Sequence, residues 1–318
     1  MYRVSGEMKV FAGNGNRALA GAICEHLGAR LGEAHVGRFP DGEVDVKIME
    51  DVRGRDIFIV QPTCPPVNDH LMELCIMVDA ARRSSAGRIT AVLPYFGYAR
   101  KDRKDEGRVP ITAKLVANML VGAGADRVLA LDLHATQIQG FFDIPMDHLF
   151  SFPVLCDCFK ERNIPDLVVA TPDVGGIRMA KAFAGALDVN LAVVDKRRVS
   201  PDKAVAGIVI GDVKGRNVLL VDDMITTAGS ITSAAHTLRT QGARDIYVAS
   251  AHGVLCGPAV DRILESPIRQ IVVTDSIPLN HKAQSLGERI CVRSVSGLLA
   301  EAIRRIHSNE SVSSLFAQ

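Results

Sequence analysis

One stretch, residues 217–231 (NVLLVDDMITTAGSI), constrains this chain more than any other. The apolar run at residues 218–221 predicts a buried strand that leads into Asp222 and Asp223. A loop of small residues follows, and residues 231–240 then have helical spacing. The expected unit is therefore strand, loop and helix, with an acidic pair where the strand ends.

The loop between this strand and helix is suited to a phosphate group. Its residues are Thr226, Thr227, Ala228, Gly229 and Ser230. A loop that opens a helix leaves backbone N–H groups unpaired at the positive end of the helix dipole. Its three hydroxyl groups add donors, and Gly229 permits positive φ. We therefore expect amides and hydroxyls of this loop to bind a phosphate.

Asp222 and Asp223 are unsuited to a phosphate, but adjacent carboxylates can accept hydrogen bonds from neighbouring hydroxyl groups. A ligand with a phosphate at one end and a vicinal diol at the other is a ribose 5-phosphate unit. A solvated turn explains an isolated Asp-Asp pair, whereas the acidic pair, loop and helix together are much more specific. The whole stretch resembles the signature of the phosphoribosyltransferase fold that binds 5-phosphoribosyl 1-diphosphate (PRPP).

Bulk properties of the chain exclude several classes of protein. Its 318 residues favour about two domains. A net charge of +1 argues against a general nucleic-acid binder. No apolar run approaches the roughly 20 residues of a membrane span, and the amino-terminal residues lack the apolar core of a signal peptide. The scattered cysteines are expected to be free thiols of a cytoplasmic protein.

Alternating strands and helices predict parallel sheets. Strands are expected at residues 8–13, 35–39, 44–49, 56–61, 89–95, 127–133, 167–170, 191–195, 218–221, 245–250 and 271–274. Helices are expected at residues 16–27, 68–84, 110–122, 177–187, 231–240, 258–264 and 296–306. Pro110 suits the first turn of its helix, and Pro153 is a candidate domain boundary. Residues 97–108 and 196–207 are polar and predict loops, the second of them mobile.

A weak internal repeat relates the two halves. Residues 57–95 and 217–250 both run strand, loop, helix and strand, with Gly-Arg or Gly-Ala-Arg before the last strand. The first copy lacks the acidic pair. This pattern indicates a duplicated fold in which the second copy alone keeps the sugar-phosphate loop.

Further candidate residues follow other predicted strands. Phe39 lies beside Asp41 and Glu43 around a turn, where a ring and acceptors could hold a purine; a plain hairpin corner also explains them. The basic segment at residues 100–104 could bind phosphate oxygens, because arginine forks match them, although most charge runs are solvated surface.

Three more loops lie at the carboxyl ends of predicted strands, where α/β sheets bind ligands. His134 ends one strand, although a single histidine is more often structural. Asp173 could hold hydrated Mg²⁺ beside two glycines whose amides can face an anion, although a plain turn explains them too. Lys196 and the two arginines after it open the polar loop. The combined inventory indicates phosphoryl-group transfer between a nucleotide and a pentose phosphate.

Over nearly its whole length the chain resembles the ribose-phosphate diphosphokinases (PRPP synthetases) of the phosphate-dependent class. The motifs that carry the resemblance are GRFPDGEVDVKI, LPYFGYARKDRK, ITAKLVANML, LDLHATQIQGFFDIP, TPDVGG, DKRR, VDDMITTAGSI and AEAIRRIHSNESVSSLF. The resemblance implies two tandem phosphoribosyltransferase-type domains, each with a central, mainly parallel sheet flanked by helices. They span residues 8–152 and 153–295, and a C-terminal helix at residues 296–316 packs back on the first. Cytoplasmic homohexamers with ATP bound across a subunit interface are also implied.

The resemblance also implies roles for individual residues. The ATP site would comprise Phe39, Asp41, Glu43, Arg100, Lys101, Asp102 and Arg103. Ribose 5-phosphate would be bound by Asp222, Asp223, Thr226, Thr227, Ala228, Gly229 and Ser230. The diphosphate loop would comprise Asp173, Gly175 and Gly176, and Mg²⁺ would be served by His134 and Asp173. Catalysis would depend on Lys196 and Arg198, on a flexible loop.

Two departures from the family pattern lie within this set. Thr226 stands where most relatives have aspartate, and Lys101 stands where many have glutamine. The resemblance further implies activation by phosphate at a site between subunits, and the matching positions are Arg53, Ser85, Arg108, Ser311 and Ser313.

The expected reaction transfers a diphosphoryl group from MgATP to the C1 hydroxyl of ribose 5-phosphate. A phosphoribosyltransferase, which would consume PRPP and need no adenine site, is one alternative. A non-catalytic, regulatory relative is another. The compact stretch at residues 196–211 and the retained cations argue against the second alternative.

Overall fold

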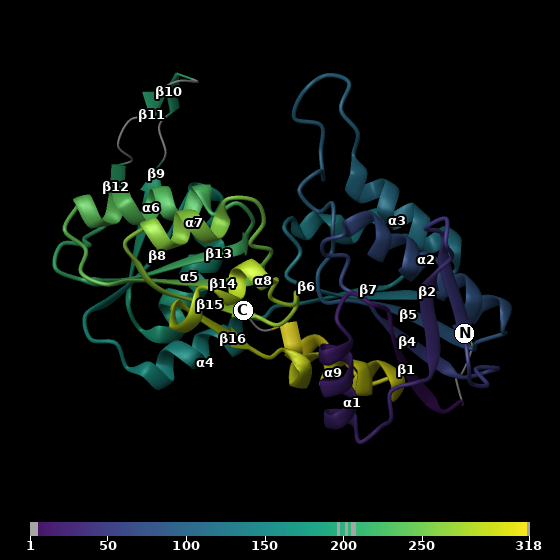
Figure 1. Cartoon of the computed structure of the whole chain (residues 1–318). Helices are drawn as coiled ribbons and strands as arrows, with labels where there is room; N and C mark the ends of the chain where they lie inside the picture. Colours follow the sequence, from purple (N-terminus) through teal and green to yellow (C-terminus); the bar gives the residue numbers. More distant parts are fainter. Residues whose placement is uncertain (1–5, 196–197, 201–202, 205–207, 317–318) are drawn as a thin grey trace. The chain divides into compact units, whose positions relative to one another are not determined.

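A computed structural model describes residues 6–195, 198–200, 203–204 and 208–316 (Figure 1). The chain forms two compact units. The amino-terminal unit extends to Phe150 and also takes Ser276–Pro278 and the segment that begins at Val295. The carboxyl-terminal unit comprises Ser151–Asp275 and Leu279–Ser294.

The amino-terminal unit is built on a five-stranded parallel sheet. Its strands, in spatial order, are β1 (Met8–Ala12), β4 (Asp56–Val60), β5 (Arg88–Leu93), β6 (Arg127–Leu131) and β7 (Met146–Leu149). Side chains of β4 alternate between the two faces, as the period of a strand requires. Ile57 and Ile59 pack in the core cluster that includes α2 (Val67–Arg83) and α3 (Thr112–Ala123). Phe58 and Val60 pack in the cluster of the opposite face, with α1 (Arg17–Leu27) and α9 (Ser296–His307).

A separate antiparallel hairpin, β2 (Ala34–Arg38) and β3 (Val44–Ile48), forms its own two-stranded sheet. Its apolar side chains Val36, Val46 and Ile48 pack against the cluster that contains α2. The hairpin is therefore attached to the unit by side chains rather than by the ladder of the central sheet.

The carboxyl-terminal unit contains a seven-stranded sheet. The spatial order is β12 (Ile208–Ile210), β9 (Asn190–Asp195), β8 (Leu167–Thr171), β13 (Asn217–Ile225), β14 (Ile246–Gly253), β15 (Ile268–Thr274) and β16 (Ile290–Arg293). All neighbours are parallel except β12 with β9. A short pair, β10 (Arg198–Ser200) with β11 (Lys203–Ala204), stands apart from it.

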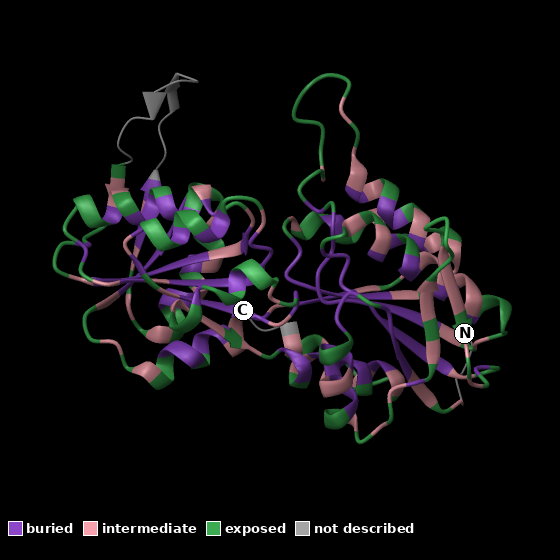
Figure 2. Cartoon of the chain, viewed as in Figure 1, coloured by how far each residue is buried: buried purple, intermediate pink, exposed green. Residues whose placement is uncertain are grey.

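Helices cover both faces of this second sheet. Val218 and Leu220 of β13 share a core with α6 (Gly229–Thr240) and α7 (Ala259–Glu265). Leu219 and Val221 share the opposite core with α4 (Phe152–Arg162) and α5 (Ile177–Leu187). Figure 2 shows the result, with buried strands and helices that are buried along one side. The predicted fold class, two α/β units with mainly parallel sheets flanked by helices, is confirmed.

Several expectations about individual elements were wrong. The mixed segment before Pro153 contains β7, and no helix was expected at α4, whose first turn holds Pro153, where a missing N–H costs nothing. The two units divide just before this residue, between Phe150 and Ser151. Pro110 precedes α3, whose N-cap is Ile111. The last helix, α9, ends at His307, and a separate 3₁₀ turn follows it. Among the described residues, no helix is long and apolar enough to cross a bilayer.

A buried ion pair attaches α9 to the amino-terminal unit. Asp56, 0% exposed, accepts from Arg88 Nε at 2.9 Å and from Nη2 at 2.5 Å. His307 Nδ1 lies 2.8 Å from Asp56 Oδ2, and Arg88 Nη2 also donates to the carbonyl of Ile306 at 2.9 Å. The carboxylate therefore joins the amino ends of β4 and β5 to the end of α9.

We expect Asp56→Ala to lower the free energy of unfolding by about 3–5 kcal/mol, because Arg88 would lose its buried counter-charge. Urea unfolding measures the change. The matched control is Asp79→Ala, which removes an exposed ion pair with Arg83 on α2 and should cost less than about 1 kcal/mol. Equal losses in the two variants would contradict this account of the buried pair.

Candidate active site

Three neighbouring strands of the carboxyl-terminal unit deliver the predicted loops to one edge of its sheet. β9, β8 and β13 are adjacent and parallel, so their carboxyl ends lie at the same edge. The segments that follow them begin at residue 196, at Pro172 and at Thr226. This is the edge at which parallel α/β sheets bind ligands.

Asp222 and Asp223 lie within β13, which continues to Ile225 rather than ending before the acidic pair. Both side chains are half-buried, and the amide of Asp223 donates to Asp222 Oδ1 at 3.0 Å. Burial raises the pKa of the Asp222 carboxyl well above its usual range, and the charges of Asp223 and Asp173 raise it further. The charge of Asp173 therefore acts on the Asp222 carboxyl. The three carboxylates give the site an excess of negative charge, which hydroxyl donors or a cation would relieve.

The phosphate loop has a different backbone from the one expected. Ala228, not Gly229, has the left-handed conformation, with φ of 60°. This conformation is unfavourable for a residue with a Cβ, and such strain is common at functional sites. Gly229 lies close to Arg262, and a Cβ there would lie 3.2 Å from its Nη1.

Residues distant in sequence brace this loop. Arg262 on α7 donates from Nη1 to the carbonyl of Thr227 at 2.9 Å, and the amide of Cys256 donates to the carbonyl of Thr226 at 2.9 Å. Thr232 Oγ1 donates to the carbonyl of Ala228 at 2.8 Å. These bonds occupy the carbonyls of the loop. The first amides of α6 have no partner within the helix, as at any helix start, and Ser230 lies in this first turn.

The loop after β8 is held by its own side chains. Asp173 Oδ1 accepts from the amide of Gly175 at 2.9 Å and caps a short 3₁₀ turn. Thr171 Oγ1 donates to the carbonyl of Asp173 at 2.9 Å. The exposed Asp173 carboxylate is thus fixed next to two glycines.

We expect Gly176→Ala to lower kcat/KM of the expected diphosphoryl transfer about tenfold to hundredfold. The Cβ of the alanine would overlap with Thr171 Oγ1 and displace the loop. Steady-state kinetics test this expectation. Gly185→Ala is the matched control: a Cβ meets nothing within 4 Å there, so activity should be unchanged. An active Gly176→Ala variant would show that this loop does not need its present shape.

The hairpin turn of the amino-terminal unit carries the candidate adenine residues. Phe39 is 49% exposed, and Asp41 and Glu43 are exposed beside it. The turn closes through Phe39 N to the carbonyl of Glu43 at 2.8 Å and through Glu43 N to Asp41 Oδ1 at 3.1 Å. An exposed ring and two carboxylates therefore share one short turn, at the end of a hairpin.

The basic loop after β5 adjoins the loop after β6. Gln137 Nε2 donates to Asp102 Oδ2 at 2.8 Å, which links the two. Lys101 Nζ lies 3.4 Å from Asp105 Oδ2, whereas Arg100 and Arg103 are exposed. His134 is also exposed and lies in the second of these loops. Neighbouring strands thus bring cations and a histidine to one edge.

The remaining predicted residues are placed only in part. Lys196 lies outside the described residues, and of Arg198 the structure gives only its backbone, in β10. Of the regulatory candidates, the carbonyl of Ser85 accepts from the amide next to Arg53 at 2.8 Å, and Ser311 Oγ donates to Ser313 Oγ at 3.1 Å. Arg108 lies in the loop after the carboxyl end of β5, whereas Ser85 precedes the amino end of that strand.

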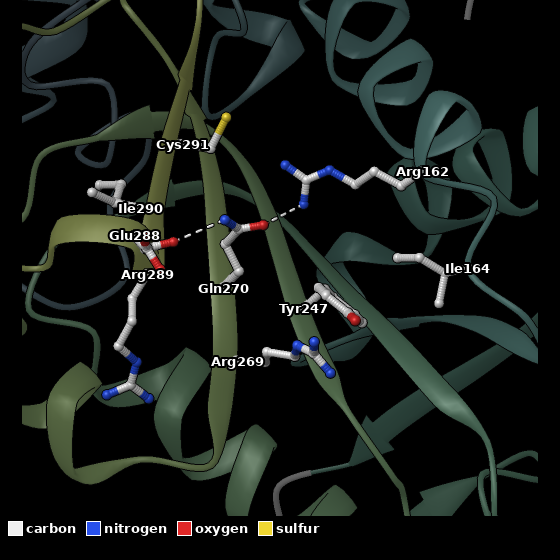
Figure 3. Close-up of a pocket in the computed structure, with 9 residues that line it drawn as sticks. All are labelled: Arg162, Ile164, Tyr247, Arg269, Gln270, Glu288, Arg289, Ile290 and Cys291. Atoms are coloured by element: carbon white, nitrogen blue, oxygen red, sulfur yellow. Dashed lines mark hydrogen bonds between the residues drawn. The ribbon is translucent and has the colours of Figure 1, made fainter.

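A hollow of about 810 Å³ lies elsewhere in the carboxyl-terminal unit (Figure 3). Its lining residues are Arg162, Ile164, Tyr247, Arg269, Gln270, Glu288, Arg289, Ile290 and Cys291. Arg162 and Ile164 come from the end of α4 and the segment after it, and the others lie at or just before the amino ends of β14, β15 and β16, whereas the predicted loops follow carboxyl ends. Arg162 Nη1 donates to Gln270 Oε1 at 2.5 Å, and Gln270 Nε2 donates to the carbonyl of Glu288 at 2.9 Å. This hollow contains none of the predicted site residues.

Fold and loops define a class: a two-unit α/β protein in which a strand with an acidic pair, a loop and a helix lie at the carboxyl edge of one sheet. Two family models match, "N-terminal domain of ribose phosphate pyrophosphokinase" at residues 8–124 and "Phosphoribosyl synthetase-associated domain" at residues 197–317.

Relatives match along nearly the whole chain. The ribose-phosphate pyrophosphokinase of Rhodopirellula baltica is 54% identical over 98% of this chain and 99% of its own. That of Rhizobium meliloti is 55% identical over 97% and 100%. The crystal structure of phosphoribosylpyrophosphate synthetase from Mycobacterium smegmatis has a TM-score of 0.90 and 41% identity, and the match covers 95% of this chain and 99% of that one. The chain belongs to the ribose-phosphate pyrophosphokinase family, as its motifs predicted.

Proposed function

We propose that the protein transfers the diphosphoryl group of ATP to the C1 hydroxyl of ribose 5-phosphate, which gives PRPP and AMP. The observation that carries this proposal is the arrangement at the end of β13. Two half-buried carboxylates there precede a braced loop that opens a helix. Asp222 and Asp223 accept hydrogen bonds from the ribose hydroxyls, and residues 226–230 bind the 5-phosphate.

The reaction needs little covalent chemistry from the protein. The C1 oxygen of ribose 5-phosphate attacks the β-phosphorus of ATP in line. The bond from that phosphorus to the oxygen that bridges it to the α-phosphorus breaks, so that this oxygen leaves with AMP, and the C1 hydroxyl proton is released to solvent. Catalysis is therefore mainly positioning and charge stabilisation. Lys196 and Arg198 close over the transferring group and exclude water.

The nucleotide is bound by the residues of the amino-terminal unit. Phe39 stacks on adenine while Asp41 and Glu43 accept from its amine. The basic loop, with Arg100, Lys101, Asp102 and Arg103, lies along the phosphates. We propose that this site is completed at a subunit interface of a cytoplasmic homohexamer whose domains span residues 8–152 and 153–295.

Mg²⁺ fits the carboxylates that the structure describes. Among the described residues, no group of three or more His, Cys, Asp or Glu side chains could hold a metal ion by itself. Mg²⁺ is commonly bound by one or two carboxylates together with water and substrate phosphates, and the exposed Asp173 suits that role. We propose that Asp173 and His134 serve this ion, which would neutralise charge on the phosphate oxygens.

One assay tests the function. The protein is given ATP and ribose 5-phosphate, with phosphate varied, and AMP and PRPP are quantified. We expect AMP and PRPP in equal amounts and a faster rate with phosphate, through the site that includes Arg53, Ser85, Arg108, Ser311 and Ser313. PRPP consumption with a nucleobase, and no AMP release, would instead identify a phosphoribosyltransferase.

A further inference from the structure

A buried glutamate in the amino-terminal unit has an unusual set of partners. Glu73 lies on α2 and is 2% exposed, although glutamate is rarely buried. Its Oε2 accepts from the amide of Asn14 at 3.1 Å and from Gln61 Nε2 at 2.8 Å. Its Oε1 accepts from Asn14 Nδ2 at 3.0 Å. Neutral amide groups therefore hold this carboxylate in place.

The network fills the edge that corresponds to the sugar-phosphate site of the other unit. Gln61 follows β4 as Asp222 follows the apolar run of β13 in the internal repeat. It is fully buried, and its Oε1 accepts from the amide of Gly15 at 2.9 Å. A Cβ on Gly13 would lie 2.5 Å from the same oxygen. The turn after β1 is thus packed directly on Gln61 and Glu73, where the first copy has no acidic pair.

Asn14 connects this network to the hairpin. Its Nδ2 donates both to Glu73 and to the carbonyl of Val36 in β2 at 3.0 Å. A carboxylate only accepts, so Glu73 determines which end of the Asn14 amide faces it. The same orientation directs an N–H group at Val36, on the strand that leads into Phe39.

Other polar contacts hold the base of the hairpin, where the amide of Gly32 donates to the carbonyl of Val10 at 2.7 Å and Lys9 pairs with Glu50. Arg38 Nη2 lies 2.7 Å from Asp69 Oδ2 of α2, but both side chains are about 40% exposed, so this pair is worth little. The apolar side chains of Val36, Val46 and Ile48 pack the hairpin against the cluster that contains α2. The bond from Asn14 is directional and sets the position of β2.

We propose that Glu73 is a positioning residue for ATP. It orients Asn14, Asn14 fixes β2, and the hairpin thereby presents Phe39, Asp41 and Glu43 in a single arrangement for adenine. This inference rests on the proposed function and on its adenine site, and it adds a residue that touches neither substrate.

The test compares Glu73→Gln with the unsubstituted full-length protein. Glutamine has the same shape but replaces an acceptor oxygen with a donor nitrogen, so one amide of the network loses its acceptor. We expect KM for ATP to rise about threefold to tenfold. Values of kcat and KM for ribose 5-phosphate should stay within about twofold. A loss of kcat alone, or equal rises in both KM values, would overturn the proposal.

Two further variants separate positioning from general destabilisation. Asn14→Ala should reproduce the selective rise, and the double variant should be no worse than either single one, because both act through one bond. Asp56→Asn, at the other end of β4, should lower stability without changing KM for ATP. If the rises in KM for ATP caused by Asn14→Ala and Glu73→Gln were additive, the two residues would not act through the same bond.

Hydrogen exchange does not depend on activity, so it distinguishes a failure of this inference from a failure of the proposed function. Hydrogen exchange of the amides at residues 34–48 should be faster in Glu73→Gln and unchanged in Asp56→Asn. Unchanged exchange in Glu73→Gln overturns the inference. An unsubstituted protein that releases no AMP overturns the proposed function, whatever the exchange shows.

Discussion

Replacing Lys196 by alanine is expected to lower kcat by about 10³–10⁵-fold, the range for a cation that stabilises a transferring phosphoryl group. The binding of both substrates should change little, because the contact is made chiefly in the transition state. Lys196 follows β9, which lies next to β8 and so beside Asp173 and the edge that carries the sugar-phosphate loop. Steady-state AMP release gives kcat, and calorimetric titration gives the dissociation constants.

The matched control for this variant is Lys214→Ala. Lys214 is exposed and precedes the amino end of β13, so it lies away from the candidate edge of the same unit. Its loss should leave kcat unchanged. An active Lys196→Ala protein would remove this residue from the mechanism and leave Arg198 as the remaining catalytic candidate.

Replacing both Asp222 and Asp223 by alanine should lower kcat/KM for ribose 5-phosphate about 10²–10⁴-fold, since hydrogen bonds to charged groups contribute about 1.5–3 kcal/mol each. The fold should survive. Burial and neighbouring negative charges raise the pKa of Asp222, so removing these groups relieves repulsion rather than breaking a stabilising pair. Kinetics and thermal unfolding on the same samples separate the two effects.

The control removes two carboxylates from the opposite edge of the same sheet. Asp166 and Asp245 form exposed ion pairs with Arg244 and Arg269, near the amino ends of β13 and β14. Their replacement by alanine should leave turnover intact. Similar losses in both double variants would mean that the effect on turnover is not specific to the acidic pair of β13.

Local patterns in the sequence predicted most of the candidate site. The strand, loop and helix around Asp222, and the loop that holds Asp173, occupy the predicted edge because parallel strands must end together. The same reasoning could not assign the strained residue of the phosphate loop. Ala228 has positive φ, and the loop is held by Arg262, which donates to the carbonyl of Thr227 from far along the chain.

Elements with weak local patterns were missed for related reasons. β7 is short and polar at its second position, where Asp147 pairs with Arg127, so it has no continuous apolar run. Pro153 indicates only a candidate domain boundary in the sequence, and the helix α4 that it opens was not predicted. The network of Glu73 joins four segments through a few hydrogen bonds, and a sequence contains no local sign of such contacts.

The structure of the protein with bound ribose 5-phosphate tests the central claim most directly. The account predicts that the vicinal hydroxyls contact the carboxylates of Asp222 and Asp223 and that the phosphate lies against the amides and hydroxyls of residues 226–230. A pentose phosphate bound at any other place, with the end of β13 empty, would contradict it.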